Sequence, residues 1–207
     1  MRSKFLVAAA LLAGAASPLV AQTTVTPFIG SMIPMTSLLA DTGGNGGFRM
    51  QAHTIYGLRF AKAMSPSLGL ELALGAGSGS MQVASTDVID LDFAVYFADL
   101  RARFRVAGND DTNLGIVAGA GWTQFSSGFF DAAHEADEDT KFKGTATGIV
   151  GLGFQAKVTD RLIFSFDATD RIHEQGIDAA GLDTDQYTKY LQHDATFTFG
   201  LAFPLGN

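Results

Sequence analysis

Residues 196–203 read TFTFGLAF, and this stretch decides how the rest of the chain is interpreted. Successive side chains of a β-strand point to opposite faces, so one face carries all the large residues, Phe197, Phe199, Leu201 and Phe203. The other face carries only threonine, glycine and alanine. A half-buried strand of a soluble protein is usually polar opposite its apolar face. Bulky residues backed by small ones instead favour a strand that contacts lipid on one side and lines a narrow barrel on the other.

Seven further segments alternate in the same way, each close to the length of about 10 residues that a tilted transmembrane strand needs. They are 24–32, 53–61, 68–78, 91–106, 114–125, 145–158 and 162–169. The clearest is 68–78, where leucines alternate with glycine, alanine and Glu71. The facing of 24–32 stays open, because Val25, Phe28 and Ile29 do not share one parity. We predict an all-β fold, an eight-stranded antiparallel up-and-down transmembrane β-barrel.

The segment 91–106 changes parity in its middle. Its second half places Leu100, Ala102 and Phe104 on the lipid-facing side, whereas its first half places Leu91, Phe93 and Val95 on the other parity. If large apolar residues always face outward, the strand needs an extra residue to change phase. The sequence therefore predicts a β-bulge near Tyr96 or Phe97, or an end of the lipid zone there.

The connections between the segments fall into two classes. Three are short, namely 62–67, 107–113 and 159–161, and four are long and polar or glycine-rich, namely 33–52, 79–90, 126–144 and 170–190. Short periplasmic turns and longer outside loops are typical of outer-membrane barrels, so the first and last strands are expected to have their free termini in the periplasm. No backbone donor or acceptor can be left unpaired in hydrocarbon, so segment 24–32 must pair with segment 196–203.

The N-terminus has the layout of a secretory signal peptide. Arg2 and Lys4 precede an apolar run, 5–16, which is followed by small residues up to Ala21. The run is shorter than the about 20 residues that a membrane-spanning helix needs. We predict a cleaved signal peptide over 1–21 and one outer-membrane β-barrel domain over 22–207.

Composition supports this class and excludes others. Of the 207 residues, 47% are apolar and 17% are charged, against about 25% charged in an average soluble protein. The formal net charge of -7 argues against nucleic acid as a partner. The chain has no cysteine, which excludes both disulfides and a lipid anchor on cysteine.

These strands, loops and the aromatic final strand resemble the eight-stranded outer-membrane β-barrel proteins, the group that includes the OmpA transmembrane domain and the OmpX- and OmpW-like proteins. The resemblance covers 22–207 and rests on pattern and strand number. It implies that the final strand, with Phe197, Phe199, Leu201 and Phe203, is the C-terminal signal read by the barrel-assembly machinery. In such chains the aromatic residue is often the last one, whereas here Pro204 and three further residues follow.

Seven charged residues with inward parity form a candidate group: Arg59, Glu71, Asp99, Arg101, Arg103, Lys157 and Asp167. The interior of an eight-stranded barrel is just wide enough for side chains to fill. A lone buried charge is costly, so these groups are expected to pair with one another. The favoured interpretation is a structural charge network that closes the lumen, and the alternative is a gated ion path.

Acidic residues gather in the third and fourth long loops: Asp131, Glu135, Asp137, Glu138, Asp139, Asp170, Glu174, Asp178, Asp183 and Asp185. Carboxylates can hold Ca²⁺ or Mg²⁺, but the Asp-x-Asp-x-Asp-Gly spacing of a calcium loop is missing. A solvated surface is the simpler interpretation. We predict no metal site and no cofactor.

The four histidines bear on whether the protein is an enzyme. Some eight-stranded barrels modify lipids, and this chemistry needs a nucleophilic serine, a histidine base and an acid close together. His193, toward the outer end of the last strand, is the best candidate base, while His53, His134 and His173 fall at strand ends or in loops. No serine occupies an obvious partner position.

Aromatic residues are expected to form belts at the two membrane–water interfaces. The outer belt is expected to contain Tyr96, Phe97, Trp122, Phe125 and Tyr190, and the inner belt Phe60, Phe104, Phe164 and Phe203.

The sequence therefore predicts a non-enzymatic, integral protein of the bacterial outer membrane with a structural, envelope or surface-interaction role through its four long loops. The alternative is a narrow, OmpW-like, porin-like channel for small or apolar solutes, and a lipid-modifying enzyme is a third hypothesis. The expected partners are outer-membrane lipid and, during insertion, the barrel-assembly machinery. We expect a monomer.

Overall fold

The computed structural model describes residues 23–36, 40–41, 48–83, 89–109, 111–127, 140–142, 144–174, 177–179, 187–188 and 191–205. The predicted signal peptide, 1–21, lies outside these residues. In the part of the chain that the structure describes, no helix is long and apolar enough to cross a membrane.

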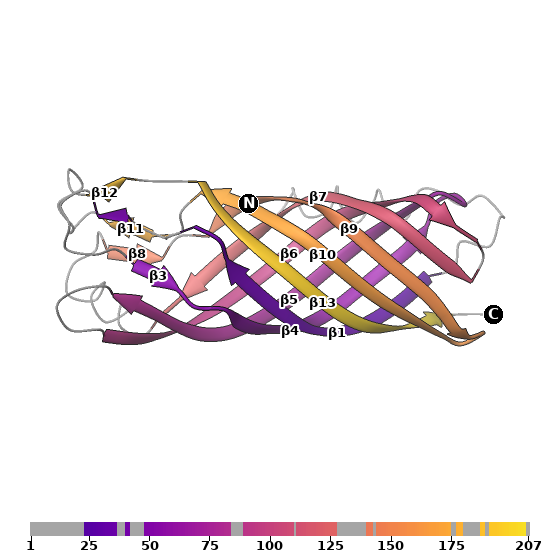
Figure 1. The fold of residues 1–207 in the computed structure, drawn as a ribbon, viewed down its shortest axis with the longest axis horizontal. Coiled ribbons are helices and arrows are strands. Elements are labelled where there is room, and N and C mark those ends of the chain that lie inside the picture. The colour runs from indigo at the N-terminus through magenta and orange to yellow at the C-terminus, as the bar shows by residue number, and fades with distance from the viewer. Residues whose placement is uncertain are drawn as a thin grey trace, which may run out of the picture.

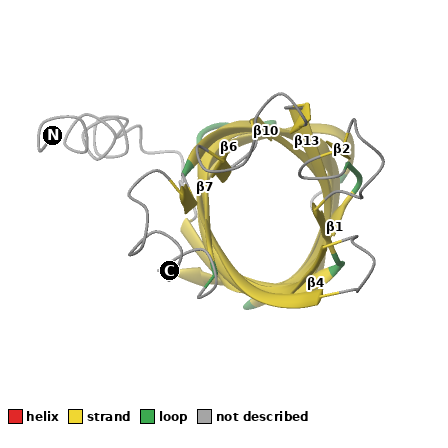
Figure 2. Cartoon of the chain, turned by 90° about the vertical axis from the view of Figure 1, so that its left-hand side faces the viewer, coloured by secondary structure: helices red, strands yellow, loops and turns green. Residues whose placement is uncertain are grey.

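Eight long antiparallel strands form the body of the protein (Figure 1): β1 (Thr23–Pro34), β4 (His53–Ala63), β5 (Leu68–Val83), β6 (Ile89–Gly108), β7 (Thr112–Ser126), β9 (Thr145–Thr159), β10 (Leu162–Glu174) and β13 (Leu191–Leu205). Their order is β5-β4-β1-β13-β10-β9-β7-β6, and a further pairing of β5 with β6 closes the ring. Figure 2 shows this ring along its axis. The predicted all-β, up-and-down, eight-stranded barrel is confirmed.

Five short strands lie at the end of the barrel where the long connections are (Figure 1): β2 (Ala40–Asp41), β3 (Phe48–Met50), β8 (Thr140–Phe142), β11 (Ile177–Ala179) and β12 (Tyr187–Thr188). β3 continues the main sheet beside β5, while β8 pairs with β11 and β2 with β12. The opposite end carries the three short turns, after Ala63, Gly108 and Thr159. The predicted division into a short-turn end and a long-loop end is therefore present.

One of the four long connections is shorter than expected. The predicted loop 79–90 is mostly strand, because β5 runs to Val83 and β6 begins at Ile89, and these two residues are paired with each other. β5 and β6 thus extend beyond the segments predicted for them at the long-loop end.

The barrel closes between β1 and β13, as predicted. Val25 lies opposite Phe203, Ile29 opposite Phe199 and Ile33 opposite Ala195. Within this register only the positions of Thr26 and Pro27 lack a pairing, and proline has no N–H to donate to the ladder. The parity left open for this strand is now clear: Phe28 points inward and Ile29 outward.

Large apolar residues cover the outside of the barrel. Leu152 and Phe199 are exposed, whereas Glu71 and Arg101 are only 2% and 6% exposed. The other outward residues include Tyr56, Leu58, Phe60, Leu74, Leu100, Phe104, Leu114, Ile116, Val150, Phe197, Leu201 and Phe203. This arrangement is the one that a barrel in hydrocarbon requires.

The predicted bulge near Tyr96 or Phe97 is wrong. The register between β5 and β6 is continuous from Ile89 to Phe104, and the irregularity of β6 lies between Arg105 and Ala107. The strand needs no phase change, because Phe93, Val95 and Phe97 are buried inside the barrel.

The outer aromatic belt is corrected for the same reason. Phe97 and Phe125 are buried in the interior, with Phe125 at 0% exposure, whereas Tyr96 and Trp122 face outward at 52%. Tyr190 lies outside the described residues. Together with Met32, Ile55 and Met81, which are also buried, these rings fill the interior on the long-loop side with apolar atoms.

Candidate functional site

Five charged side chains meet inside the barrel, and strand alternation places them there. Glu71 on β5 lies directly opposite Arg101 on β6, and Arg103 follows two residues later on the same face. Arg59 reaches the interior from β4 and Asp167 from β10. These five residues, Arg59, Glu71, Arg101, Arg103 and Asp167, are called the lumen cluster below.

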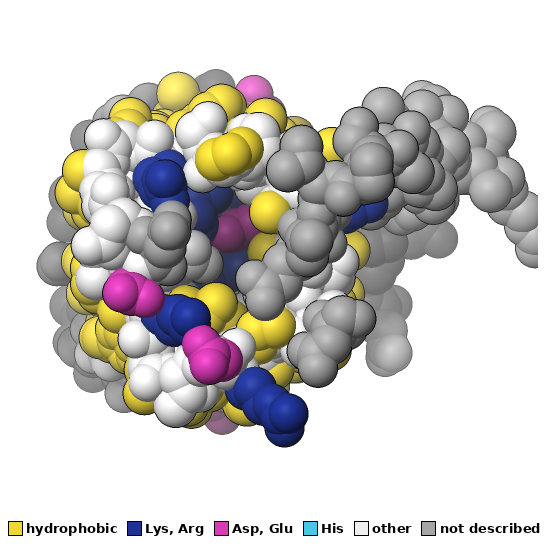
Figure 3. Space-filling model, turned by 90° about the vertical axis from the view of Figure 1, so that its right-hand side faces the viewer, with side chains coloured by type: hydrophobic (Ala, Val, Ile, Leu, Met, Phe, Trp, Pro, Cys, Tyr) yellow, Lys and Arg dark blue, Asp and Glu magenta, His cyan; other side chains and the backbone are white. Residues whose placement is uncertain are grey.

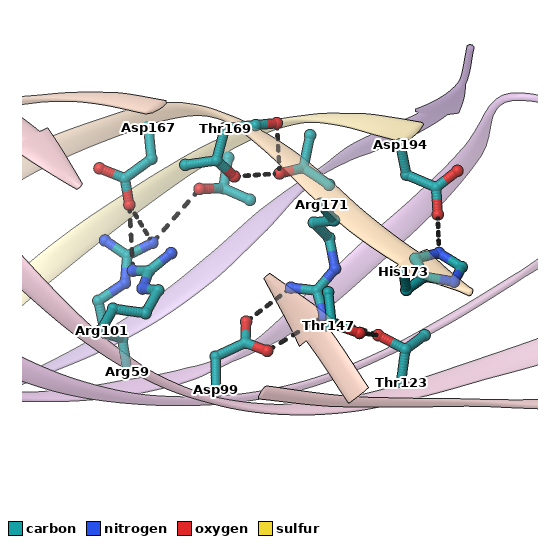
Figure 4. A network of polar contacts seen from close by, with 12 residues as sticks. Arg59, Asp99, Arg101, Thr123, Thr147, Asp167, Thr169, Arg171, His173 and Asp194 are labelled. Atoms are coloured by element: carbon teal, nitrogen blue, oxygen red, sulfur yellow. Dashed lines mark hydrogen bonds and ion pairs between the residues drawn. The ribbon is translucent and has the colours of Figure 1, made fainter. Parts of the chain in front are cut away.

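The two carboxylates of the lumen cluster are shared among three guanidinium groups. Glu71 accepts hydrogen bonds from Arg101 Nη2 at 2.7 Å and from Arg103 Nε at 2.8 Å. Asp167 pairs with Arg103 Nη2 at 2.7 Å, with Arg59 Nη2 at 2.6 Å and with Arg101 Nη2 at 3.3 Å. All five side chains are buried, so the network joins the neighbouring strands β4, β5 and β6 to β10 across the interior of the barrel. Figure 4 shows the contacts of Asp167 with Arg59 and Arg101.

Asp99 belongs to a second ion pair, whose partner the sequence analysis missed. Arg171 Nη1 lies 2.6 Å from Asp99 Oδ2, and Arg171 Nη2 donates to Thr123 Oγ1 at 2.9 Å. The guanidinium also lies 4.4 Å from the ring centre of Phe97, within the range of a cation–π contact. Arg171 was assigned to a loop, although it continues the inward alternation of Asp167 and Thr169.

A third polar group lies further along β10 and β13. His173 and Asp194 are buried, with His173 Nε2 2.8 Å from Asp194 Oδ2, and Gln192 Nε2 donates to Asp194 Oδ1 at 3.0 Å. His53 is also buried, with its ring edge-on to Phe93 at 4.9 Å. Two of the four histidines therefore lie inside the barrel, and His134 lies outside the described residues.

Lys157 is the one predicted member of the network that lies elsewhere. Its side chain is 39% exposed at the short-turn end, where Nζ forms a 2.7 Å ion pair with Asp160. The hydrogen bond and charge of Lys157 lower the pKa of Asp160 below its ordinary value. Inward parity alone misplaces this residue, because β9 ends at Thr159 and the side chain reaches water at the barrel mouth.

Little empty space remains between the lumen cluster and the Asp99–Arg171 pair. Gly153 on β9 leaves room for the guanidinium of Arg103, since a Cβ at this position would overlap Arg103 Nη1 and approach Asp167 Oδ1 to 2.6 Å. The cavity inside the barrel that is lined by Arg59, Asp99, Arg101 and Arg171 has a volume of only about 10 Å³. The short-turn end is hollowed instead, with two cavities of about 170 and 240 Å³ whose rim carries both signs of charge (Figure 3).

His193, the candidate base, is partly exposed on the outer wall. Its Nδ1 lies 2.8 Å from Asp170 Oδ2, so a histidine and an acid do meet here. Among the described residues, the hydrogen bonds of this pair include no serine hydroxyl, and Thr36 Oγ1 accepts from the backbone N–H of His193. In the described part of the chain, the pair therefore supplies the histidine and the acid of a triad-like arrangement and contacts no serine nucleophile.

The acidic loop residues Asp131, Glu135, Asp137, Glu138, Asp139, Asp183 and Asp185 lie outside the described residues. Asp170 and Glu174 belong to β10 and Asp178 to β11. The described part of the chain contains no group of three or more histidine or acidic residues that could hold a metal ion.

The four aromatic and aliphatic residues of the final strand, Phe197, Phe199, Leu201 and Phe203, all face outward. β13 continues through Pro204 to Leu205, two residues further than expected. This orientation makes the side chains available to lipid. Recognition of these four side chains by the barrel-assembly machinery stays a prediction.

Solved structures with the same fold were found, whereas no protein-family model and no curated protein matches the chain. The outer membrane protein OprG from Pseudomonas aeruginosa is 14% identical, with 90% of this chain and 97% of that chain covered and a TM-score of 0.65. AlkL, determined in DMPC lipid bilayers, is 11% identical with a TM-score of 0.55 and coverage of 93% and 94%. Outer membrane protein W of E. coli is 16% identical with a TM-score of 0.52 and coverage of 91% and 100%.

The fold and the charged interior together define the class of protein: an eight-stranded, outer-membrane-type β-barrel. The similar structures are outer membrane proteins, which supports the predicted location in the outer membrane. At these identities the similarity concerns the fold, and the functional question rests on the residues of this chain.

Proposed function

We propose that the protein is an integral outer-membrane barrel that is closed to solutes at its centre and acts through its long-loop end, in a structural, envelope or surface-interaction role. The observation that carries this proposal is the lumen cluster. Arg103 joins Glu71 to Asp167, and Arg59 and Arg101 complete the connection. Opening a path would separate buried charges, which costs several kcal/mol for each ion left unpaired.

Conductance in planar lipid bilayers tests this proposal. The wild-type barrel is expected to give little or no current, while an Arg101→Ala/Arg103→Ala double variant, which removes two guanidinium groups from the lumen, is expected to conduct. Lys157→Ala is the matched control, because it removes a positive charge at the mouth and leaves the lumen cluster in place. Regular single-channel steps from the wild-type protein would contradict the proposal.

A narrow channel for small or apolar solutes is the second candidate. The observation in its favour is the apolar long-loop side of the interior, where Phe93, Phe125 and Met81 are buried. Wild-type single-channel steps that are abolished by filling the lumen, for example by Gly121→Phe, would favour this candidate over the first.

The Asp170–His193 pair on the outer wall is the observation that supports the third candidate, a lipid-modifying enzyme. An acid that orients a histidine can prepare its other ring nitrogen to accept a proton. Lipid A and phospholipid profiles of cells with the wild type, His193→Ala or no protein test this idea. Identical profiles would exclude it.

The proposal also includes two partners, outer-membrane lipid and the barrel-assembly machinery, and a monomeric state. The outward face of β13 supports the first two, because its large side chains are accessible along the wall. A Phe199→Ser/Phe203→Ser variant is expected to reach the outer membrane in smaller amounts than an Ile116→Ser/Leu152→Ser control, which also loses two lipid-facing residues. Equal amounts would argue against a special role of the final strand. Sizing in detergent tests the monomer.

A further inference from the structure

The small cavity inside the barrel lies among residues of both the lumen cluster and the Asp99–Arg171 pair. Arg59, Arg101 and Arg171 line it together with Asp99 and Thr198, and Phe28 and Phe97 contribute aromatic carbon to its wall. Its volume of about 10 Å³ is close to the space taken by a single water-sized particle. The cavity can therefore hold one small species.

The three arginines around this cavity each keep one hydrogen-bond donor without an acceptor. Among the described residues, Arg59 Nε, Arg101 Nε and Arg171 Nε are buried atoms with no hydrogen-bond partner, and Arg59 Nε has Glu71 Oε2 at 3.8 Å as its nearest ion-pair contact. A guanidinium N–H can only donate, and a buried donor without an acceptor costs about 1–3 kcal/mol. Thr198 adds a fourth donor, because its hydroxyl accepts from Arg59 Nη2 and keeps its own O–H for another group.

The lumen cluster and the Asp99–Arg171 pair, taken together, also carry an excess positive charge. They contain four guanidinium groups, on Arg59, Arg101, Arg103 and Arg171, and three carboxylates, on Glu71, Asp99 and Asp167. One positive charge is therefore unbalanced at a site where every side chain is buried. Such a charge is costly in the interior unless a counter-ion accompanies it.

Asp194, which lies opposite Arg171 in the register, does not supply the missing negative charge. It is engaged with His173, whose Nδ1 is 2.8 Å from the carbonyl oxygen of Glu174 and whose Nε2 is 2.8 Å from Asp194 Oδ2. A carbonyl oxygen only accepts, so Nδ1 carries a hydrogen, and a second proton must lie between Nε2 and Oδ2. The His173–Asp194 pair is therefore neutral as a whole.

We propose that this cavity is a binding site for a small monovalent anion of the halide class, such as chloride. A water molecule could accept hydrogen bonds from only two of the donors on these lining residues and would leave the positive charge unbalanced. A halide ion accepts from Arg59, Arg101, Arg171 and Thr198 together and balances the charge of the lumen cluster and the Asp99–Arg171 pair. This inference is independent of the role of the long-loop end.

The full-length barrel, folded in detergent at one ionic strength with chloride, bromide or gluconate as the sole anion, provides the test. The folded form is expected to persist to a higher temperature in chloride and bromide than in gluconate, which is too large for the cavity. Heat-modifiable migration on a gel measures this shift. Crystals grown from the bromide sample should show an anomalous peak among Arg59, Arg101 and Arg171.

Arg101→Gln removes the excess charge and one Nε donor, so the difference between chloride and gluconate is expected to disappear. Arg105→Gln on the same strand, near the short-turn mouth, is the control and should keep the difference. Equal transition temperatures of the wild type in all three anions, with no bromide peak, would show an ordered water only and overturn the proposal. An unchanged anion dependence in Arg101→Gln would also overturn it.

Discussion

Arg103 on β6 and Asp167 on β10 are joined by a 2.7 Å hydrogen bond, although β7 and β9 lie between their strands in the sheet. The same guanidinium donates through Nε to Glu71 on the neighbouring strand β5. One side chain thus ties distant parts of the wall together through the interior. The stability of this ion-pair network depends on both carboxylates, Glu71 and Asp167, because each is shared by more than one arginine.

Asp167→Ala is expected to destabilise the folded barrel strongly. It leaves Arg59, Arg101 and Arg103 with Glu71 as their only carboxylate in the lumen cluster, and removing one partner of a buried ion pair costs about 3–5 kcal/mol. Urea unfolding in lipid vesicles measures the free energy of unfolding of each variant. The control, Asp160→Ala, removes an aspartate from an exposed pair and should change it little. Similar losses in both variants would contradict the importance of the lumen cluster.

Gly153→Ala is expected to disturb the lumen cluster without changing any charge. The added Cβ would overlap Arg103 Nη1, whereas the nearest atom to a Cβ at Gly69 is 3.8 Å away. Overpacking of this kind costs about 1–3 kcal/mol. Urea unfolding should therefore separate Gly153→Ala from the control Gly69→Ala. If the two variants unfold at the same urea concentration, the guanidinium of Arg103 does not occupy the position described.

Closure of the barrel can be tested with engineered cysteines, since the chain has none of its own. Ile29 and Phe199 lie directly opposite each other on β1 and β13. Directly opposed residues of antiparallel strands have Cα separations of about 4.5–5.5 Å, within the disulfide range. An Ile29→Cys/Phe199→Cys variant should cross-link under mild oxidation, while Ile29→Cys/Phe203→Cys, displaced by four residues, should not. The reverse pattern would contradict the register.

The outward face of the barrel could be predicted from sequence because lipid selects large apolar side chains at every second position. The leucines of β5 and the phenylalanines of β13 follow this rule, and the pairing of β1 with β13 follows from the need to satisfy every backbone group. The inward charges of the lumen cluster were found for the same reason, since each occupies a position that alternates with the outward apolar residues of its strand.

The rule fails where the interior itself is apolar. Phe93, Phe97 and Phe125 fill the lumen beyond the charged groups, so size no longer distinguishes inside from outside there. Arg171 and His173 were missed because Asp170 and Glu174, at alternate positions, give the outer end of β10 the polarity of a loop. The partners of the charges could not be read from the sequence at all, because strands far apart in the chain meet only across the lumen.

The fluorescence of Trp122, the only tryptophan of the chain, tests the central claim most directly. Trp122 faces outward and Phe125, three residues later on β7, faces the interior. In vesicles of phospholipids brominated on their acyl chains, Trp122 emission is expected to be quenched, and that of a Trp122→Phe/Phe125→Trp variant to be largely preserved. Quenching of the second protein but not of the first would show that the apolar face and the lumen are exchanged, and the account would be wrong.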